Sequence, residues 1–142
     1  MKKILSVIFS ITIGLSSCTN DNDNENPNNC DLETILSAGQ FTTAPSDQLT
    51  IKSLKIENNC LKINFSSSGC SGNTWEIKLI DSGNILESNP PQRNLRLSLK
   101  NEEFCDAFIT KELTFDISNL KVNVNKVLLN ISNFDDKFLY EY

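Results

Sequence analysis

The chain has 142 residues, a formal net charge of −5 at neutral pH and no histidine. Its acidic balance would repel the phosphates of a nucleic acid, and it lacks the side chain that most often serves as a general base or metal ligand near pH 7. Nucleic-acid binding is therefore disfavoured, and catalysis by Ser–His or Cys–His pairs is excluded.

The first 17 residues have the layout of a bacterial export signal. Lys2 and Lys3 give a basic start, and the apolar stretch Ile4–Gly14 that follows is too short for a bilayer core of about 30 Å. Leu15-Ser16-Ser17-Cys18 resembles a bacterial lipobox, in which the cysteine is lipidated and becomes the mature N-terminus. The resemblance implies a signal peptide over residues 1–17 and a fatty-acyl (palmitate) anchor on that cysteine. An ordinary secretory signal with an incidental cysteine is the alternative.

The segment from Thr19 to Asn29 is polar and acidic, with no large apolar side chain. Such a composition buries too little surface to offset the entropy of ordering, so residues 18–29 are expected to form a flexible tether. Asp21, Asp23 and Glu25 are similar to the export signal of Bacteroidota surface lipoproteins. That similarity implies a lipid-anchored position at the outer membrane, facing outward.

Removal of the signal changes both the size and the charge of the protein. Loss of residues 1–17 leaves 125 of the 142 residues, enough for one domain with its own core. Lys2 and Lys3 are removed with the signal, so 11 of the 13 basic side chains remain against 18 acidic ones, a charge of −7. Such a surface does not bind an anionic membrane, so the membrane contact is expected to be the lipid alone.

The other four cysteines are Cys30, Cys60, Cys70 and Cys105. An even number in an exported domain predicts two disulfides, with three possible connectivities. A four-thiolate zinc site is the alternative, but the close cysteine pairs that such sites use are missing. We therefore expect disulfides, no metal site and no cofactor.

Apolar residues alternate with polar ones from Leu49 to the C-terminus, the pattern of half-buried strands. Residues 31–47 lack a period and are expected to be an irregular or short-strand lead-in. Turn signals at Glu57-Asn58-Asn59, Asp81-Ser82-Gly83 and Asn89-Pro90-Pro91 separate the strands. The side chains expected to point inward are Leu61, Ile63, Phe65, Trp75, Ile77, Leu79, Leu95, Leu97, Leu99, Leu113, Phe115, Ile117, Val127, Leu129 and Ile131.

This pattern predicts one all-β domain over residues 30–142. Its most favoured form is an immunoglobulin-like β-sandwich of about seven short strands, and a small β-barrel is the alternative.

From about residue 49 to 120 the chain resembles a group of small Bacteroidota envelope lipoproteins. The matching features are Ser68-Gly69-Cys70, the strand from Trp75, Asn89-Pro90-Pro91, Leu95-x-Leu97-x-Leu99, Asn101 ahead of Cys105-Asp106, and the run Leu113–Leu120. The resemblance implies that Cys70 pairs with Cys105, which leaves Cys30 to pair with Cys60. Members of the group often carry histidines where this chain has Asn73 and Lys100, so a site built on those histidines is not expected here.

These features favour a non-catalytic surface module that binds a protein or glycan, or supports an envelope assembly. An inhibitor of an envelope-attacking enzyme such as a lysozyme is the first alternative, because an acidic protein is attracted to a basic target. An enzyme using the carboxylates of Glu102, Glu103 and Asp106, or of Asp135 and Asp136, is the second, and a solvated acidic turn explains those residues more simply.

Aromatic side chains are the other candidates for contact with a ligand. Trp75 begins an alternating strand, so it is expected in the core rather than on a sugar-binding face. Tyr140 and Tyr142 are better candidates for an exposed aromatic contact, although a closing edge strand also explains them.

Overall fold

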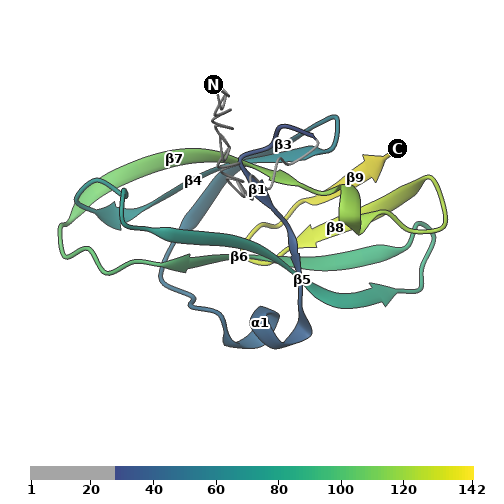
Figure 1. The fold of residues 1–142 in the computed structure, drawn as a ribbon, viewed down its shortest axis with the longest axis horizontal. Helices are drawn as coiled ribbons and strands as arrows, with labels where there is room; N and C mark the ends of the chain where they lie inside the picture. The colour runs from purple at the N-terminus through teal and green to yellow at the C-terminus, as the bar shows by residue number, and fades with distance from the viewer. Residues whose placement is uncertain (1–27) are drawn as a thin grey trace, which may run out of the picture.

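The computed structural model describes residues 28–142, which form two packed β-sheets (Figure 1). One sheet has the strand order β1-β7-β4-β3, and the other has the order β2-β5-β6-β8-β9. The strands are β1 (Leu32–Glu33), β2 (Ile35–Leu36), β3 (Thr50–Glu57), β4 (Cys60–Gly69), β5 (Glu76–Leu86), β6 (Gln92–Lys100), β7 (Ala107–Asp116), β8 (Lys126–Ile131) and β9 (Lys137–Glu141). Two separate sheets confirm the all-β sandwich and not the barrel.

The core lies between the sheets and is built from the predicted phase of each strand. Thirteen of the fifteen side chains expected to point inward are buried. The other two, Ile77 and Leu113, are half-buried and pack against the same core. A register error of one residue in a strand would have exposed all of its predicted core side chains. Their burial therefore confirms the predicted strand phases.

The predicted turn at Glu57-Asn58-Asn59 is present: it joins the antiparallel strands β3 and β4 into a hairpin, and Asn58 has a φ of 56°. The predicted break at Asp81-Ser82-Gly83 is wrong, because β5 continues through it to Leu86. The register with β6 shifts between Asp81 and Ile85, and Gly83 has a φ of 78°, so this segment is a bulge within the strand.

The bulge places an acid in the core. Asp81 is fully buried, and its Oδ1 lies 3.1 Å from Nη1 of Arg93 on β6. Arg93 Nε also donates to the carbonyl of Leu120 at 2.9 Å. Burial raises the pKa of Asp81, while hydrogen bonds from the Gly83 N–H and Arg93 oppose that rise.

Residues 32–36 run across the edges of both sheets. β1 pairs in parallel with β7, and β2 pairs in parallel with β5, with the buried Thr34 between them. The predicted short-strand lead-in is therefore present, but a short helix, α1 (Ala38–Thr43), follows it without having been predicted. Ser37 caps α1 by accepting a hydrogen bond from the Gln40 N–H at 3.2 Å.

Helix α1 lies outside the sheet that contains β5 and β6 (Figure 1). Arg96, on the outward phase of β6, donates to the carbonyls of Gln40, Ala44 and Pro45 at 3.0–3.3 Å. These contacts hold the C-terminal end of the helix against the strand.

Strand register brings two loops to the same end of the sandwich, at the left of Figure 1. Gly69 at the end of β4 pairs with Ala107 at the start of β7. Glu76 at the start of β5 pairs with Lys100 at the end of β6. The β4–β5 loop (70–75) and the β6–β7 loop (101–106) are therefore neighbours.

Candidate functional site

A disulfide joins the two neighbouring loops. Cys70 and Cys105 are bonded with their Cα atoms 4.8 Å apart, and the second disulfide joins Cys30 to Cys60 with Cα atoms 5.7 Å apart. The prediction of two disulfides is confirmed, and the partners are those that the resemblance implied. The loop pair is thus linked covalently as well as through its strands.

The Glu103 carboxylate is held within the β4–β5 loop by backbone donors. Its Oε2 accepts hydrogen bonds from the N–H groups of Cys70, Ser71 and Gly72 at 2.6, 3.0 and 3.0 Å. Its Oε1 accepts one from the Thr74 hydroxyl at 2.9 Å. The Gly72 N–H, together with the donors of Ser71, Thr74 and Cys70, lowers the pKa of Glu103 to about 2. Glu103 is therefore an ionised structural link between the loops at neutral pH.

Two glycines make this close approach possible. A Cβ on Gly69 would lie 2.5 Å from Glu103 Oε2 and 3.0 Å from the Trp75 ring. Gly72 has a φ of 69°, a conformation that favours glycine. Lys111 donates to the Gly72 carbonyl, and its Nζ lies 5.7 Å from the centre of the Trp75 ring. The loop is thus packed onto β7 as well as onto Glu103.

Asn101 connects the β6–β7 loop to the end of β4 and to Asp47 in the segment before β3. Its side chain donates to the Ser68 carbonyl at 2.7 Å, and its backbone N–H donates to Asp47 Oδ2 at 2.7 Å. The Glu103 N–H in turn donates to Asn101 Oδ1 at 2.9 Å. Residues on both sides of Phe104 are therefore fixed, by these hydrogen bonds and by Cys105.

Two phenylalanines are exposed on this fixed frame. Phe104 is 97% exposed and Phe108 is 79% exposed, whereas the other exposed large hydrophobic side chains of residues 28–142 are 37–48% exposed. Phe108 pairs with Ser68 and has the opposite phase to the buried Phe115, so it lies on the outer face of its sheet. We call Phe104 and Phe108 together the aromatic patch.

A small pocket of about 150 Å³ lies beside Phe108. It is lined by Gln48, Leu49, Thr50, Ser66, Ser67, Ser68 and Phe108. Ser67 is satisfied internally, because its hydroxyl donates to the Gln48 carbonyl at 2.6 Å. Ser66 is only 1% exposed, and within residues 28–142 its hydroxyl has no hydrogen-bond partner. The pocket therefore combines an aromatic rim with a buried and unpaired hydroxyl.

The predicted carboxylate group is only partly assembled. Glu102 and Asp106 are exposed, and Glu102 lies 3.8 Å from Lys100 Nζ. Asp135 and Asp136 are exposed in the turn between β8 and β9. A general acid near pH 7 needs a raised pKa, whereas that of Glu103 is lowered. This geometry gives no support to the acid–base reading of the loop.

The three aromatic candidates differ in how far their side chains are exposed. Trp75 is 9% exposed and belongs to the core, as predicted. The prediction that Tyr140 is an exposed contact is wrong, because this side chain is 1% exposed, while Tyr142 is 37% exposed. Asn73 is exposed, and Lys100 forms an ion pair with Glu76 at 2.9 Å. Neither position contributes to the aromatic patch.

Sequence reasoning missed the aromatic patch, although one signal for it was available. Phe108 has the parity of Thr110 and Glu112, which is opposite to the inward parity of Leu113 and Phe115. A large aromatic residue in the outward phase of a strand indicates either that another segment packs over it or that it belongs to a contact surface. Phe104 lies in a loop without any period, so no phase argument applied to it.

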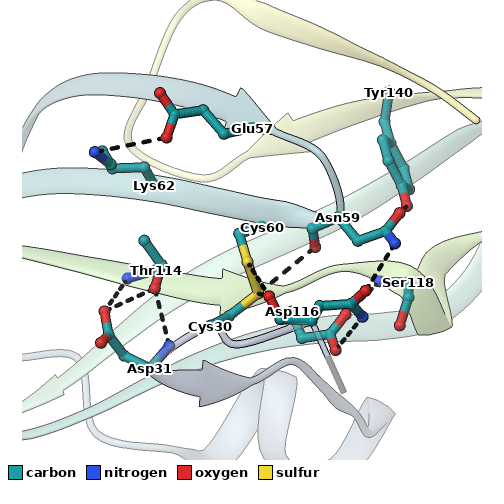
Figure 2. The surroundings of a disulfide bond; sticks show 11 residues. Cys30, Asp31, Glu57, Asn59, Cys60, Lys62, Thr114, Asp116, Ser118 and Tyr140 are labelled. Carbon is teal, nitrogen blue, oxygen red and sulfur yellow. Dashed lines mark hydrogen bonds and ion pairs between the residues drawn. A yellow bond between two sulfur atoms is a disulfide. The ribbon is translucent and has the colours of Figure 1, made fainter. Parts of the chain in front are cut away.

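The second disulfide lies where the described chain begins (Figure 2). Asn28 Nδ2 donates to Asp116 Oδ2 at 2.7 Å, and Asn59 Nδ2 donates to Asn28 Oδ1 at 2.9 Å. The Tyr140 hydroxyl donates to Asn59 Oδ1 at 2.6 Å. Asn28 was assigned to the tether, yet these contacts hold it in the domain beside Cys30. The cluster is a structural junction between the chain start and strands β4, β7 and β9.

The pKa values of this junction reflect its burial. Burial, with the nearby Asp116 carboxylate and Tyr142, raises the pKa of Tyr140 to about 12. Burial also raises the pKa of Asp116, but hydrogen bonds from Ser118 and Asn28 outweigh it, and the net shift is downward. Both groups therefore keep their ordinary charge at neutral pH.

Some predictions concern residues outside the described part of the chain. Cys18, the signal peptide (1–17) and the tether up to residue 27 lie there. Within residues 28–142 no helix is long and apolar enough to cross a membrane. That same part of the chain has no cluster of three or more His, Cys, Asp or Glu side chains able to hold a metal ion.

Neither a protein-family model nor a curated protein matches the sequence. Solved structures of similar fold include a NigD-like immunity protein from Bacteroides caccae (TM-score 0.61, 11% identity) and a toxin-related protein from Parabacteroides distasonis (TM-score 0.53, 18% identity). A protein of unknown function from Bacteroides vulgatus is also similar (TM-score 0.51, 14% identity). Each alignment covers 78% of this chain and 63%, 60% and 55% of those proteins, respectively. The chain thus spans less than two thirds of their length, and at these identities the likeness shows the fold.

Proposed function

We propose that the protein is a lipid-anchored lipoprotein of the outer membrane whose β-sandwich is a non-catalytic binding module, and that it contacts its partner through the aromatic patch. The observation that carries this proposal is the pair of phenylalanines, 97% and 79% exposed, on a loop frame fixed by a disulfide and by Glu103. Exposed aromatic side chains on a rigid frame favour binding because little conformational freedom is lost on association.

The anchor part of the proposal rests on the sequence around Cys18. The lipobox resemblance, the basic start and the short apolar stretch support export and lipidation. The similar folds found in Bacteroides and Parabacteroides proteins agree with an origin in the same phylum.

Membrane fractionation tests the anchor. Cys18→Ser should give an uncleaved or soluble protein, because no thiol is available for lipidation. If this variant still fractionates with the outer membrane after a carbonate wash, the anchor proposal is wrong. Shaving intact cells with protease should remove the domain if it faces outward, and should spare it if it faces the periplasm.

Site-specific photo-crosslinking tests the binding module. A benzophenone side chain replaces Phe104 in the full-length protein within its native envelope, and the matched control carries it at Leu139, which is 46% exposed on the other sheet. We expect one discrete adduct from position 104 and none from position 139. Equal labelling at both positions, or none at either, would contradict the proposal.

An inhibitor is the second candidate, supported by the similar fold of the NigD-like immunity protein and by the acidic net charge of −5. Its test is the rate of cell-wall lysis by lysozyme with and without the purified protein. Unchanged rates at a large excess of the protein would eliminate lysozyme as its target.

A further inference from the structure

We propose that the pocket beside Phe108 receives a lysine or arginine side chain of a basic protein partner, while Phe104 inserts into an apolar socket of that partner. This inference rests on the proposed binding function and names the class of partner. Four observations carry it: the exposure of the two rings, the unpaired hydroxyl, the charge of the loop and the rigidity of the frame.

The exposure of the rings has no structural explanation in the fold. Neither Phe104 nor Phe108 belongs to the core or packs against it. The Phe104 ring is 97% exposed, and its backbone is held in place by the disulfide-bonded Cys105 on one side and the fixed Glu103 on the other. Such protruding and pre-positioned aromatics are the anchors that carry most of the binding energy in protein interfaces.

The Ser66 hydroxyl supplies an independent sign of a ligand. Buried hydroxyl groups are normally hydrogen-bonded, because an unpaired one loses its bonds to water without replacement. Ser66 lines the pocket and has no partner within residues 28–142. The hydroxyl is itself buried, so a donor that enters the pocket, such as an ammonium or guanidinium group, pairs it when the Ser66 side chain turns toward the pocket. Its alkyl stem then lies along the Phe108 ring, a contact to which the positive charge also contributes.

The loop charge selects a basic partner. Residues 101–106 contain three carboxylates and no basic side chain, and only Glu102 has a basic neighbour in an ion pair, Lys100 at 3.8 Å, within residues 28–142. Glu103 is ionised at neutral pH because its pKa is about 2, and Asp106 is exposed. Carboxylates in the same loop as the exposed Phe104 steer a positively charged protein toward this end of the domain and repel an acidic one.

A protein fits these features better than a glycan. A neutral sugar carries no positive charge that the three carboxylates of the adjoining loop would attract from a distance. It also stacks across an aromatic face, whereas Phe104 projects from its loop and suits insertion into a concave socket. We therefore argue for a basic protein and treat the glycan as an outcome of the test.

The test is an NMR titration of the purified full-length protein with side-chain probes. The probes are N-acetyl-arginine amide, N-acetyl-lysine amide, the neutral N-acetyl-norleucine amide and N-acetylglucosamine. We expect the two basic probes to shift the resonances of Ser66, Ser68 and Phe108, with an effect that declines as salt is added. The neutral amide and the sugar should leave these resonances in place.

Two variants locate the contact. Ser66→Ala removes a hydroxyl that makes no internal hydrogen bond, so the fold should be unchanged while the basic probes bind about three- to tenfold more weakly. Phe108→Ala should weaken them about tenfold. The matched controls are Ser132→Ala and Leu139→Ala, both at exposed positions of the other sheet or the loop beside it.

The outcomes separate this inference from the proposed function. Shifts caused by the sugar and not by the basic probes would replace the basic protein with a glycan. No shift from any probe would overturn the inference, whereas the binding function is tested separately by crosslinking at position 104. Equal losses in the control variants would show that the probes bind elsewhere.

Discussion

At the scale of single residues, the Glu103 carboxylate is the group whose titration has the clearest structural effect. Its pKa is 4.5 in an unstructured chain and about 2 in the folded protein, because the Gly72 N–H and neighbouring donors bind the ionised form. A lowered pKa adds stability above the unfolded value, and that stability is lost as the pH falls from 4.5 toward 2. The loop contact is therefore expected to weaken in acid.

NMR titration of the Glu103 side chain checks this, and we expect a midpoint near pH 2. In Glu103→Gln the amide protons of Cys70, Ser71 and Gly72 should exchange faster at every pH at which wild-type Glu103 is ionised, since a neutral acceptor binds them less tightly. Glu102→Gln is the control and should leave those protons protected. A midpoint near the ordinary value would contradict the geometry of the loop.

The buried pair of Asp81 and Arg93 gives a second prediction. Arg93→Met keeps most of the side-chain volume but leaves the Asp81 carboxyl unpaired in the core, so unfolding should become easier by about 3–5 kcal/mol. Lys100→Met is the control. It breaks an exposed pair with Glu76, where the cost is about 1 kcal/mol or less. Urea denaturation of both variants measures the difference.

The pH dependence of the Arg93→Met variant follows from the sign of the Asp81 shift. Burial raises the pKa of Asp81 above its ordinary 3.8, and loss of Arg93 raises it further. The folded variant then holds the proton more tightly than the unfolded chain does. The loss in free energy of unfolding, relative to the wild type, should be smallest below pH 3.8 and should grow as the pH rises through the pKa of Asp81 in the folded variant. A deficit independent of pH would show that lost packing dominates.

These residues also show why the environment of a single side chain could not always be predicted from the sequence. Asp81-Ser82-Gly83 has turn chemistry, and local sequence cannot reveal that a distant arginine neutralises the acid inside the sheet. Tyr140 and Tyr142 look equivalent at the C-terminus, but only Tyr140 reaches Asn59 and becomes buried. Both outcomes depend on tertiary partners.

At the scale of elements, Phe115 on β7 tests the sandwich core. It is fully buried and lies opposite Leu61 of β4. Phe115→Ala should destabilise the domain by about 3–5 kcal/mol, because it leaves a cavity between the sheets. Phe108→Ala, on the same strand but 79% exposed, is the control and should change stability little. Thermal unfolding of the two variants tests the predicted phase of β7.

The longer strands were predictable because one buried face forces alternation over five residues or more. For the short elements a lead-in of short strands was expected, but neither the bounds of β1 and β2 nor helix α1 could be predicted, for different reasons. β1 and β2 are two residues each, too short to show a period, and the residue after each strand, Thr34 or Ser37, donates to the main-chain carbonyl of Asp116 or Asp81. Helix α1 has six residues and no buried side chain, so it has no apolar stripe to detect. Its position is set by Arg96.

At the scale of the whole molecule, the two disulfides bind the sandwich together. Their sequence separations are 30 and 35 residues, and closing loops of that size contributes about 3–4 kcal/mol each. For a domain with a net stability of about 5–15 kcal/mol, either loss is serious. Replacing Cys70 and Cys105 together by serine should lower stability by that amount and increase hydrogen exchange in loop 70–75. The matched variant replaces Cys30 and Cys60 and should leave that loop protected.

The end of the sandwich that carries Phe104 and Phe108 could be predicted only in part from the sequence. The cysteine pairing and the acidic loop were identified, but the placement of Phe108 and Ser66 around one pocket depends on strand register. Strand register determines which loops meet at one end of a sandwich. It depends on how distant strands pair, which the local pattern of residues does not reveal. Acids near a cysteine suggested catalysis, whereas the backbone donors around Glu103 make it a structural anion.

The position of β4 between the two disulfides has a mechanical consequence. Cys60 begins this ten-residue strand, and Cys70 follows its last residue. The shortest covalent route from Cys30 to Cys105, beside Phe104, therefore runs along a strand that is already extended and can lengthen little. A pull between a bound partner and the proposed anchor is carried along this route, and neither sheet has to unravel. In single-molecule stretching between residues 28 and 104, the oxidised protein should show no unfolding step, and the reduced protein should lengthen by stepwise loss of strands.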